Sequence, residues 1–240
     1  MREKAGVITT VMIALFAAIC YASLVLFFIP VGPMFVHFGN LLVVTAALLL
    51  GGWQGGLAGS VGMGLFDLFN GHIDAAPKTF VLKFLIGLTV GMVFRALAKR
   101  EKFPQKAFIA AAAGAFSIAS GIYMYYLLRW GNLSLKALML IPSFMVLFLL
   151  LLGFVLVGRK CRLSTSYGVI AAACGLLVNI IGETGYKFIS FLILGSHVRA
   201  ALAGAVLAQA STLINAVVAV AGGVALWIPL RKPFGQIMGH

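Results

Sequence analysis

The 240-residue sequence is poor in charged residues and especially in acidic ones, since five Asp and Glu stand against 18 Lys and Arg. Charged residues make up 10% of the chain and hydrophobic residues 62%, and the mean hydropathy is +1.11. This composition excludes an ordinary soluble globular domain. We therefore predict an integral membrane protein.

The chain also lacks the common motifs of catalysis and nucleotide hydrolysis. It has no G-x-x-x-x-G-K-[ST] phosphate loop and no H-E-x-x-H pair, and Gly59-Ser60-Val61-Gly62 does not match the G-x-S-x-G nucleophile motif. No two of the four histidines stand four apart on one helix, which argues against a helical metal site. We therefore predict no enzyme, no catalytic residue, no metal and no cofactor.

Cysteine is equally scarce. Cys20, Cys161 and Cys174 have no paired spacing, so the sequence indicates neither a disulfide framework nor a metal knuckle. We expect all three to be packing residues.

Long apolar runs are what the sequence has in abundance. Eight runs are rich in Leu, Val, Ala, Phe and Gly and are long enough to cross a bilayer as helices. They predict an all-α polytopic membrane protein with one transmembrane domain over residues 1–240. The runs cover residues 7–29, 36–52, 54–70, 79–97, 106–129, 137–157, 168–194 and 202–230.

Basic residues suggest an orientation for these runs. If each run crosses once, the basic clusters at 2–4, 95–106, 159–162 and 231–232 all fall on the same side. By the positive-inside rule this side is cytoplasmic, so both termini are predicted to lie inside. The rule also accounts for much of the net charge of +13, and we therefore predict no nucleic-acid partner.

The most informative stretch is a predicted membrane hairpin core at residues 36–97. Its first two runs are glycine-rich and are joined by a turn around Gly51 and Trp53. Because a hairpin returns to the side that it left, the polar residues at its open ends should meet at the outer membrane face. These residues are His37, Asn40, Asp67, Asn70, His72, Asp74, Lys78 and Lys83.

Asp67 and Lys83 fall about one turn inside the predicted outer boundary. An ionisable group in the apolar region is costly unless it is paired, hydrated or used. Two interpretations stay open: Asp67 forms an ion pair with Lys83 or Lys78 that ties two helices together, or these groups hold a polar ligand.

Later runs contribute further polar residues. Glu183 is the one glutamate within a run, and it either pairs with Lys187 four residues later or joins Tyr186 in contacting a ligand. In the last run, helical spacing lets three of four polar residues face one cavity. These four are Gln209, Ser211, Thr212 and Asn215.

Small residues recur at helical spacing in three runs, which predicts close packing of backbones. Ala14, Ala18 and Ala22 form one smooth stripe on the first run, whose partner is either another helix of this chain or another protein. The third and fourth runs carry the glycines expected to pack closely, which are Gly55, Gly59, Gly62, Gly87 and Gly91.

The order of these motifs resembles the substrate-capture S components of energy-coupling factor vitamin transporters. The segment HFGNLLVVTAALLLGGWQGGLAGSVGMGLFDLFNG, followed by APKTFVLKFLIGLTVGMVF, is similar to the second to fourth helices of the riboflavin and pyridoxine-like group. The alanine stripe resembles the family's coupling-subunit interface, and AQASTLINAVVAVAGGVALWIPLRK resembles its last helix. The family fold has six helices, so the resemblance implies that residues 106–158 are an extra helix pair.

The resemblance implies a subunit of a prokaryotic plasma membrane, embedded in the lipid bilayer, that binds a small water-soluble B-type vitamin or precursor at the outer face. A transmembrane coupling subunit, docked on Ala14, Ala18 and Ala22, and two cytoplasmic ATPases would drive uptake. The candidate substrate contacts are His37, Asn40, Asp67, Asn70, Lys78, Lys83, Glu183, Tyr186 and Asn215.

Two other functions stay open from the sequence. One is a stand-alone secondary transporter in which Asp67 and Glu183 relay protons or cations. The other is an intramembrane enzyme that depends on Glu183 and His37. The sequence does not choose among riboflavin, pyridoxine, pantothenate and a thiazole or pyrimidine precursor.

Overall fold

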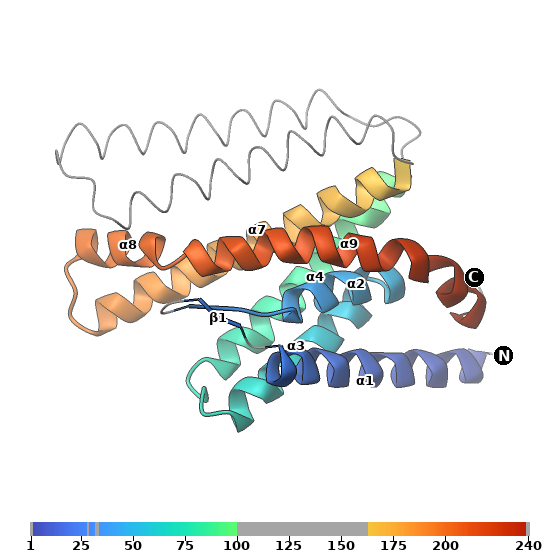
Figure 1. The fold of residues 1–240 in the computed structure, drawn as a ribbon, viewed down its shortest axis with the longest axis horizontal. Coiled ribbons are helices and arrows are strands. Elements are labelled where there is room, and N and C mark those ends of the chain that lie inside the picture. The colour runs from blue at the N-terminus through green and yellow to red at the C-terminus, as the bar shows by residue number, and fades with distance from the viewer. Residues whose placement is uncertain (1, 28, 32–33, 100–162, 239–240) are drawn as a thin grey trace.

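The computed structural model describes residues 2–27, 29–31, 34–99 and 163–238. Within these residues the chain forms seven helices and one small antiparallel strand pair (Figure 1). In chain order the elements are α1 (Arg2–Leu26), β1 (Ile29–Val31), β2 (Met34–Val36), α2 (Gly39–Leu50), α3 (Gly52–Phe69), α4 (Ala76–Ala98), α7 (Leu163–Ile193), α8 (Val198–Leu207) and α9 (Ala210–Met238).

Four helical stretches in the described part of the chain are long and apolar enough to cross a membrane. They are Gly6–Leu26, Ala76–Ala98, Ser164–Ile193 and Val198–Ile237, and α2 is a shorter apolar helix. The prediction of an all-α polytopic membrane protein is confirmed. The predicted extra helix pair at residues 106–158 lies outside the described residues.

One segment differs from the sequence expectation. The last apolar run, 202–230, is not continuous, because α8 ends at Leu207 and α9 begins at Ala210, with a turn at Ala208 and Gln209. The connection between α1 and α2 contains the strands β1 and β2. They pair in antiparallel register, Ile29 with Val36 and Val31 with Met34.

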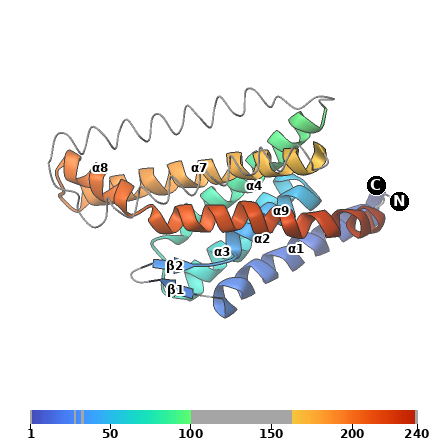
Figure 2. The same cartoon turned by 45° about the horizontal axis from the view of Figure 1, so that its top comes forward.

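The described bundle has two distinct ends. The N- and C-termini lie together at one end, which we call the terminal end (Figure 1, Figure 2). The α3–α4 loop and the α7–α8 connection lie at the other, the loop end. Most of the polar residues singled out from the sequence are at the loop end, as the hairpin argument predicts.

Between the two ends, the helices bury a continuous apolar core. Its most enclosed side chains include Val43 and Val44 of α2, Ile86 of α4 and Leu176 of α7. In a membrane bundle, close van der Waals packing of such side chains stabilises the contact between helices. Cys20 is buried in this core and Cys174 is half-buried, both as free thiols, which fits their predicted packing role.

Helices α3 and α4 touch through their glycines. A Cβ atom on Gly87 would lie 2.3 Å from the backbone nitrogen of Gly56, and one on Gly91 would lie 2.2 Å from that of Gly52. No side chain fits in this space, so the backbones themselves are in contact. The close packing predicted at Gly87 and Gly91 is therefore present.

The other predicted glycines also lie at close contacts. A Cβ on Gly55 would meet the backbone of Ala47, and one on Gly59 would meet the Val43 side chain. At the α2–α3 turn, Gly51 has φ +105°, a conformation that L side chains rarely adopt. These contacts fix the tight α2–α3 hairpin that the sequence predicts.

Candidate functional site

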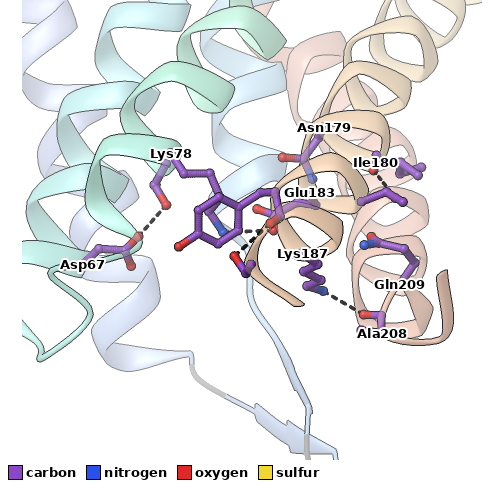
Figure 3. A network of polar contacts seen from close by, with 12 residues as sticks. Asp67, Lys78, Asn179, Ile180, Glu183, Lys187, Ala208 and Gln209 are labelled. Carbon is purple, nitrogen blue, oxygen red and sulfur yellow. Dashed lines mark hydrogen bonds and ion pairs between the residues drawn. The ribbon is translucent and has the colours of Figure 1, made fainter. Parts of the chain in front are cut away.

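The loop end contains a group of charged and amide side chains between α4 and α7 (Figure 3). On α7, Asn179, Glu183 and Lys187 stand four residues apart, so they follow one another along a single helix face. Lysines of α4 and an aspartate of α3 face them. We call this set the polar cluster; its members are Asp67, Lys78, Thr79, Lys83, Asn179, Glu183, Tyr186 and Lys187.

An ion pair links α4 to α7 in the outer part of the polar cluster. Lys78 Nζ lies 2.9 Å from Glu183 Oε2, and both side chains are mostly buried. The same ammonium lies 4.8 Å from the centroid of the Tyr186 ring, a cation–π geometry. The Tyr186 hydroxyl donates at 3.4 Å to the main-chain carbonyl of Asp74, which connects α7 to the α3–α4 loop.

Lys83 is the most deeply buried charge of the polar cluster. Its side chain is 5% exposed, and its ammonium donates a 2.9 Å hydrogen bond to Oδ1 of Asn179, which is 2% exposed. Lys78 and Glu183 lie within electrostatic range of this ammonium. Among the described residues, however, its hydrogen-bond partner is a neutral amide, so no carboxylate contact offsets the cost of burying the charge.

None of the three ion pairs considered from the sequence forms among the described residues. Asp67 accepts a hydrogen bond from the Thr79 hydroxyl instead of bonding to Lys78 or Lys83. Glu183 forms an ion pair with Lys78 of α4 across the helix interface, and not with Lys187 of its own helix.

Lys187 instead donates at 2.8 Å to the carbonyl of Ala208, the C-cap of α8. This position suits a cation, because the helix dipole places partial negative charge at a C-terminus. Figure 3 shows this contact, which joins α7 to the turn between α8 and α9.

His37 and Asn215 join the strand pair to α9. The His37 backbone N–H donates at 3.0 Å to Asn215 Oδ1, and the Gly39 N–H donates at 3.2 Å to His37 Nδ1. Burial, with a smaller contribution from the Lys83 charge, lowers the pKa of the His37 imidazole to about 3. His37 is therefore neutral at physiological pH.

Two buried amide oxygens at the loop end have no hydrogen-bond donor among the described residues. They are Oδ1 of Asn40, in the first turn of α2, and Oε1 of Gln209, at the α8–α9 turn. Their side chains are 2% and 4% exposed. Leaving such an acceptor unpaired costs about 1–3 kcal/mol, so each oxygen is available to a bound donor.

Asn70 lies apart from the polar cluster. It is exposed at the C-cap of α3, where its amide donates to Phe66 O and, at 3.5 Å, to Tyr21 Oη.

Trp53 is not among the substrate contacts predicted from the sequence. It is 61% exposed, and its ring packs edge-on against that of Phe84 with centroids 4.9 Å apart.

Sequence reasoning missed two polar residues at the loop end, Thr79 and Asn179, and it named Gln209 as a polar residue of the last run but not as a substrate contact. A signal for Asn179 was present, since it stands one helical turn before Glu183 on the same face. Thr79 carried no such signal, because a threonine in an apolar run commonly bonds its own helix backbone.

The alanine stripe of α1 is mostly uncovered. Ala14 and Ala18 are exposed and Ala22 is half-buried, whereas Phe16 and Ala17 on the opposite face are buried. Packing within the described part of the chain therefore uses the face opposite to the stripe. The described residues also contain no group of three His, Cys, Asp or Glu side chains placed to hold a metal ion.

Comparison with protein families shows a family to which the chain is similar. The family described as ECF-type riboflavin transporter, S component, matches residues 4–130, just over half of the chain. No curated protein and no solved structure matches the chain. The matched range includes the hairpin of α2 and α3, the alanine stripe of α1 and the lysines of α4.

Proposed function

Because the chain belongs to the S components of ECF-type riboflavin transporters, we propose that it captures a small water-soluble vitamin or precursor for uptake across the membrane. The family is one of transporter substrate-binding subunits and not of enzymes. The substrate binds at the loop end, where the polar cluster lies.

Lys83 is the observation that carries this proposal. A charged group within the apolar region of a membrane protein is costly, and such groups commonly mark a substrate or ion pathway. The buried Lys83 ammonium has a neutral hydrogen-bond partner in Asn179, and an ion pair and an aromatic ring, Lys78–Glu183 and Tyr186, lie in the same cluster. A few convergent polar groups among apolar and aromatic side chains are typical of a small-molecule site.

The exposed stripe of α1 supports a partner subunit. Ala14 and Ala18 present small side chains, on which another transmembrane helix can approach closely. The sequence has no phosphate-loop motif, so in our proposal other chains hydrolyse the ATP. A transmembrane coupling subunit and two cytoplasmic ATPases fulfil this role in our proposal.

Two measurements on the purified full chain test the proposal. Mass spectrometry of the small molecules released on denaturation should detect a vitamin-like compound, and affinity capture from the native membrane should recover two ATPases with a membrane subunit. Lys83→Gln should lose most of the bound compound. Lys99→Gln is the matched control, because Lys99 is exposed at the opposite end of the same helix.

The proposal fails if no small molecule copurifies and no vitamin binds. One structural feature would then favour a stand-alone proton- or cation-coupled transporter: the Lys78–Glu183 ion pair is mostly buried, and charged groups inside a membrane bundle commonly mark an ion pathway. That function requires pH-dependent uptake into vesicles that contain this chain alone.

A further inference from the structure

The polar cluster carries more positive than negative charge. Its ionisable side chains are three lysines and two carboxylates, and at their ordinary charges these leave one positive charge over. The lysines are Lys78, Lys83 and Lys187, and the carboxylates are Asp67 and Glu183. The excess lies among half-buried and buried groups, where the surrounding protein screens it far less than water would.

The hydrogen bonds show which lysines of the polar cluster carry the excess positive charge. Glu183 neutralises Lys78 at 2.9 Å. Lys83 and Lys187 donate instead to uncharged oxygens, those of Asn179 and of the Ala208 carbonyl. Within the part of the chain that the structure describes, neither of these two ammonium groups has a carboxylate in contact.

Among the described residues, the other acidic and histidine side chains near the polar cluster do not balance the excess. The Asp74 side chain is exposed in the α3–α4 loop, and Asp74 contacts the polar cluster through its main-chain carbonyl. Asp67 lies within electrostatic range of Lys83, but its hydrogen bond comes from Thr79. His37, which also faces Lys83, is neutral.

A purely structural role does not account for the charge on Lys83. Two neutral side chains could tie α4 to α7 as well as the Lys83–Asn179 bond does, without the cost of a buried ammonium. Lys83 also stands five residues after Lys78, about 7–8 Å further along the helix. It is thus the inner of the two α4 cations, below the Lys78–Tyr186 contact.

We infer that the substrate carries an anionic oxygen group, a carboxylate or a phosphate, which binds the buried Lys83 ammonium while the rest of the molecule lies toward Tyr186. This inference rests on the proposed function, since it concerns the same site. The anion supplies the missing negative charge, and charge-assisted hydrogen bonds of this kind are about twice as strong as neutral ones. The Asn179 amide nitrogen can donate to the same group.

Pairs of small molecules that differ in one charged group test this inference. Suitable pairs are nicotinate and nicotinamide, pantothenate and pantothenol, and flavin mononucleotide and riboflavin. The first two pairs probe a carboxylate and the third a phosphate. Binding of each compound to the purified full chain, in nanodiscs of uncharged phosphatidylcholine, is measured by calorimetry at low and high salt.

The anionic member of at least one pair should bind about 10-fold to 100-fold more tightly than its neutral partner, the range expected for hydrogen bonds to a charged group. Lys83→Gln should abolish this preference, and Lys99→Gln should preserve it. If Lys83→Gln does not fold, Lys187→Gln provides the second variant. It should reduce the preference, because Lys187 is the other lysine of the polar cluster that donates to an uncharged oxygen.

The remaining outcomes are decisive in the other direction. Equal or tighter binding of the neutral member in every pair that binds would overturn the anion inference and leave the proposed function intact. A charge preference that survives both Lys83→Gln and Lys187→Gln would also overturn it. Failure of all six compounds to bind, with no copurifying small molecule, would overturn both proposals.

Discussion

Helix α4 has two very different neighbours. Against α3 it presents Gly87 and Gly91, whose backbones touch those of Gly56 and Gly52. Against α7 its lysines reach across the interface to Glu183 and Asn179. A backbone contact cannot be remade with another partner, whereas a long side chain can exchange an amide or carboxylate for a ligand. The α3–α4 pair is therefore suited to be the scaffold and the α4–α7 interface to be the site.

Gly87→Ala should have the largest effect on stability, because it disrupts the backbone contact between α3 and α4. The new Cβ would lie 2.3 Å from the Gly56 nitrogen, so the two backbones must separate. We expect a loss of about 3 kcal/mol or more in the free energy of unfolding. The check is thermal or denaturant unfolding in detergent.

Gly185→Ala is the control for that substitution. It makes the same chemical change in helix α7, where no heavy atom of the described residues lies within 4 Å of the added Cβ. It should be neutral or stabilising by about 0.5–1 kcal/mol. Equal effects of the two variants would contradict the assignment of α3–α4 as the scaffold.

Acid should destabilise the folded chain through His37, which lies outside the α3–α4 scaffold. The pKa of His37 is about 3 in the folded protein, below its ordinary 6.5. Between these values the unfolded chain binds a proton that the folded chain does not, so stability is lost as the pH falls from 6.5 toward 3. One such proton contributes about 1.4 kcal/mol per pH unit.

The measurement is the melting temperature at several pH values, compared between the parent chain and two variants. His37→Gln should flatten the acid dependence, whereas His72→Gln should not, because His72 is exposed in the α3–α4 loop. An unchanged slope in His37→Gln would place the acid-sensitive group elsewhere.

A double-mutant cycle should show that Lys78 is energetically coupled to the α4–α7 interface and not to the α3–α4 scaffold. Lys78→Met and Glu183→Gln each break one side of a mostly buried ion pair. Their effects on unfolding should be non-additive by about 1–2 kcal/mol, as is usual for directly contacting charges. Lys78→Met combined with Gly87→Ala should instead be additive within about 0.5 kcal/mol, since the two positions lie about 13 Å apart along α4.

The smallest effect should come from a side-chain hydrogen bond between the middle of α3 and the start of α4. Ser60 Oγ donates at 2.7 Å to the carbonyl of Phe80. Ser60→Ala should cost about 1 kcal/mol, because a carbonyl inside a helix retains its own main-chain partner. Ser190→Ala, which removes a hydroxyl bonded within its own helix, is the control and should cost less. Equal costs would show that the bond between the helices adds nothing to the scaffold.

The scaffold was largely predictable from the sequence, because close helix packing depends on local spacing. Glycines four residues apart, such as Gly87 and Gly91, necessarily lie on one face, and a turn at Gly51 necessarily brings its two flanking helices together. The family resemblance and the membrane class followed from the same local patterns, and both are confirmed.

The partners within the polar cluster were not predictable in this way. The sequence suggested that Glu183 could pair with Lys187, but the relative rotation of α4 and α7 brings Lys78 to it first. That rotation depends on packing between segments far apart in the chain, which spacing within one helix does not encode. The break before α9 was missed for a related reason, since no proline or glycine marks Ala208 and Gln209.

The glycine contact also bears on how the protein enters the membrane. Helix α3 has six glycines among its 18 residues, and it is not among the helices apolar enough to span a bilayer by composition. Helix α4 follows α3 after a short loop, and α4 is apolar enough to span a bilayer. We therefore expect the translocation machinery to insert α3 together with α4 as one hairpin, so that a ribosome stalled before α4 is made would leave α3 outside the lipid.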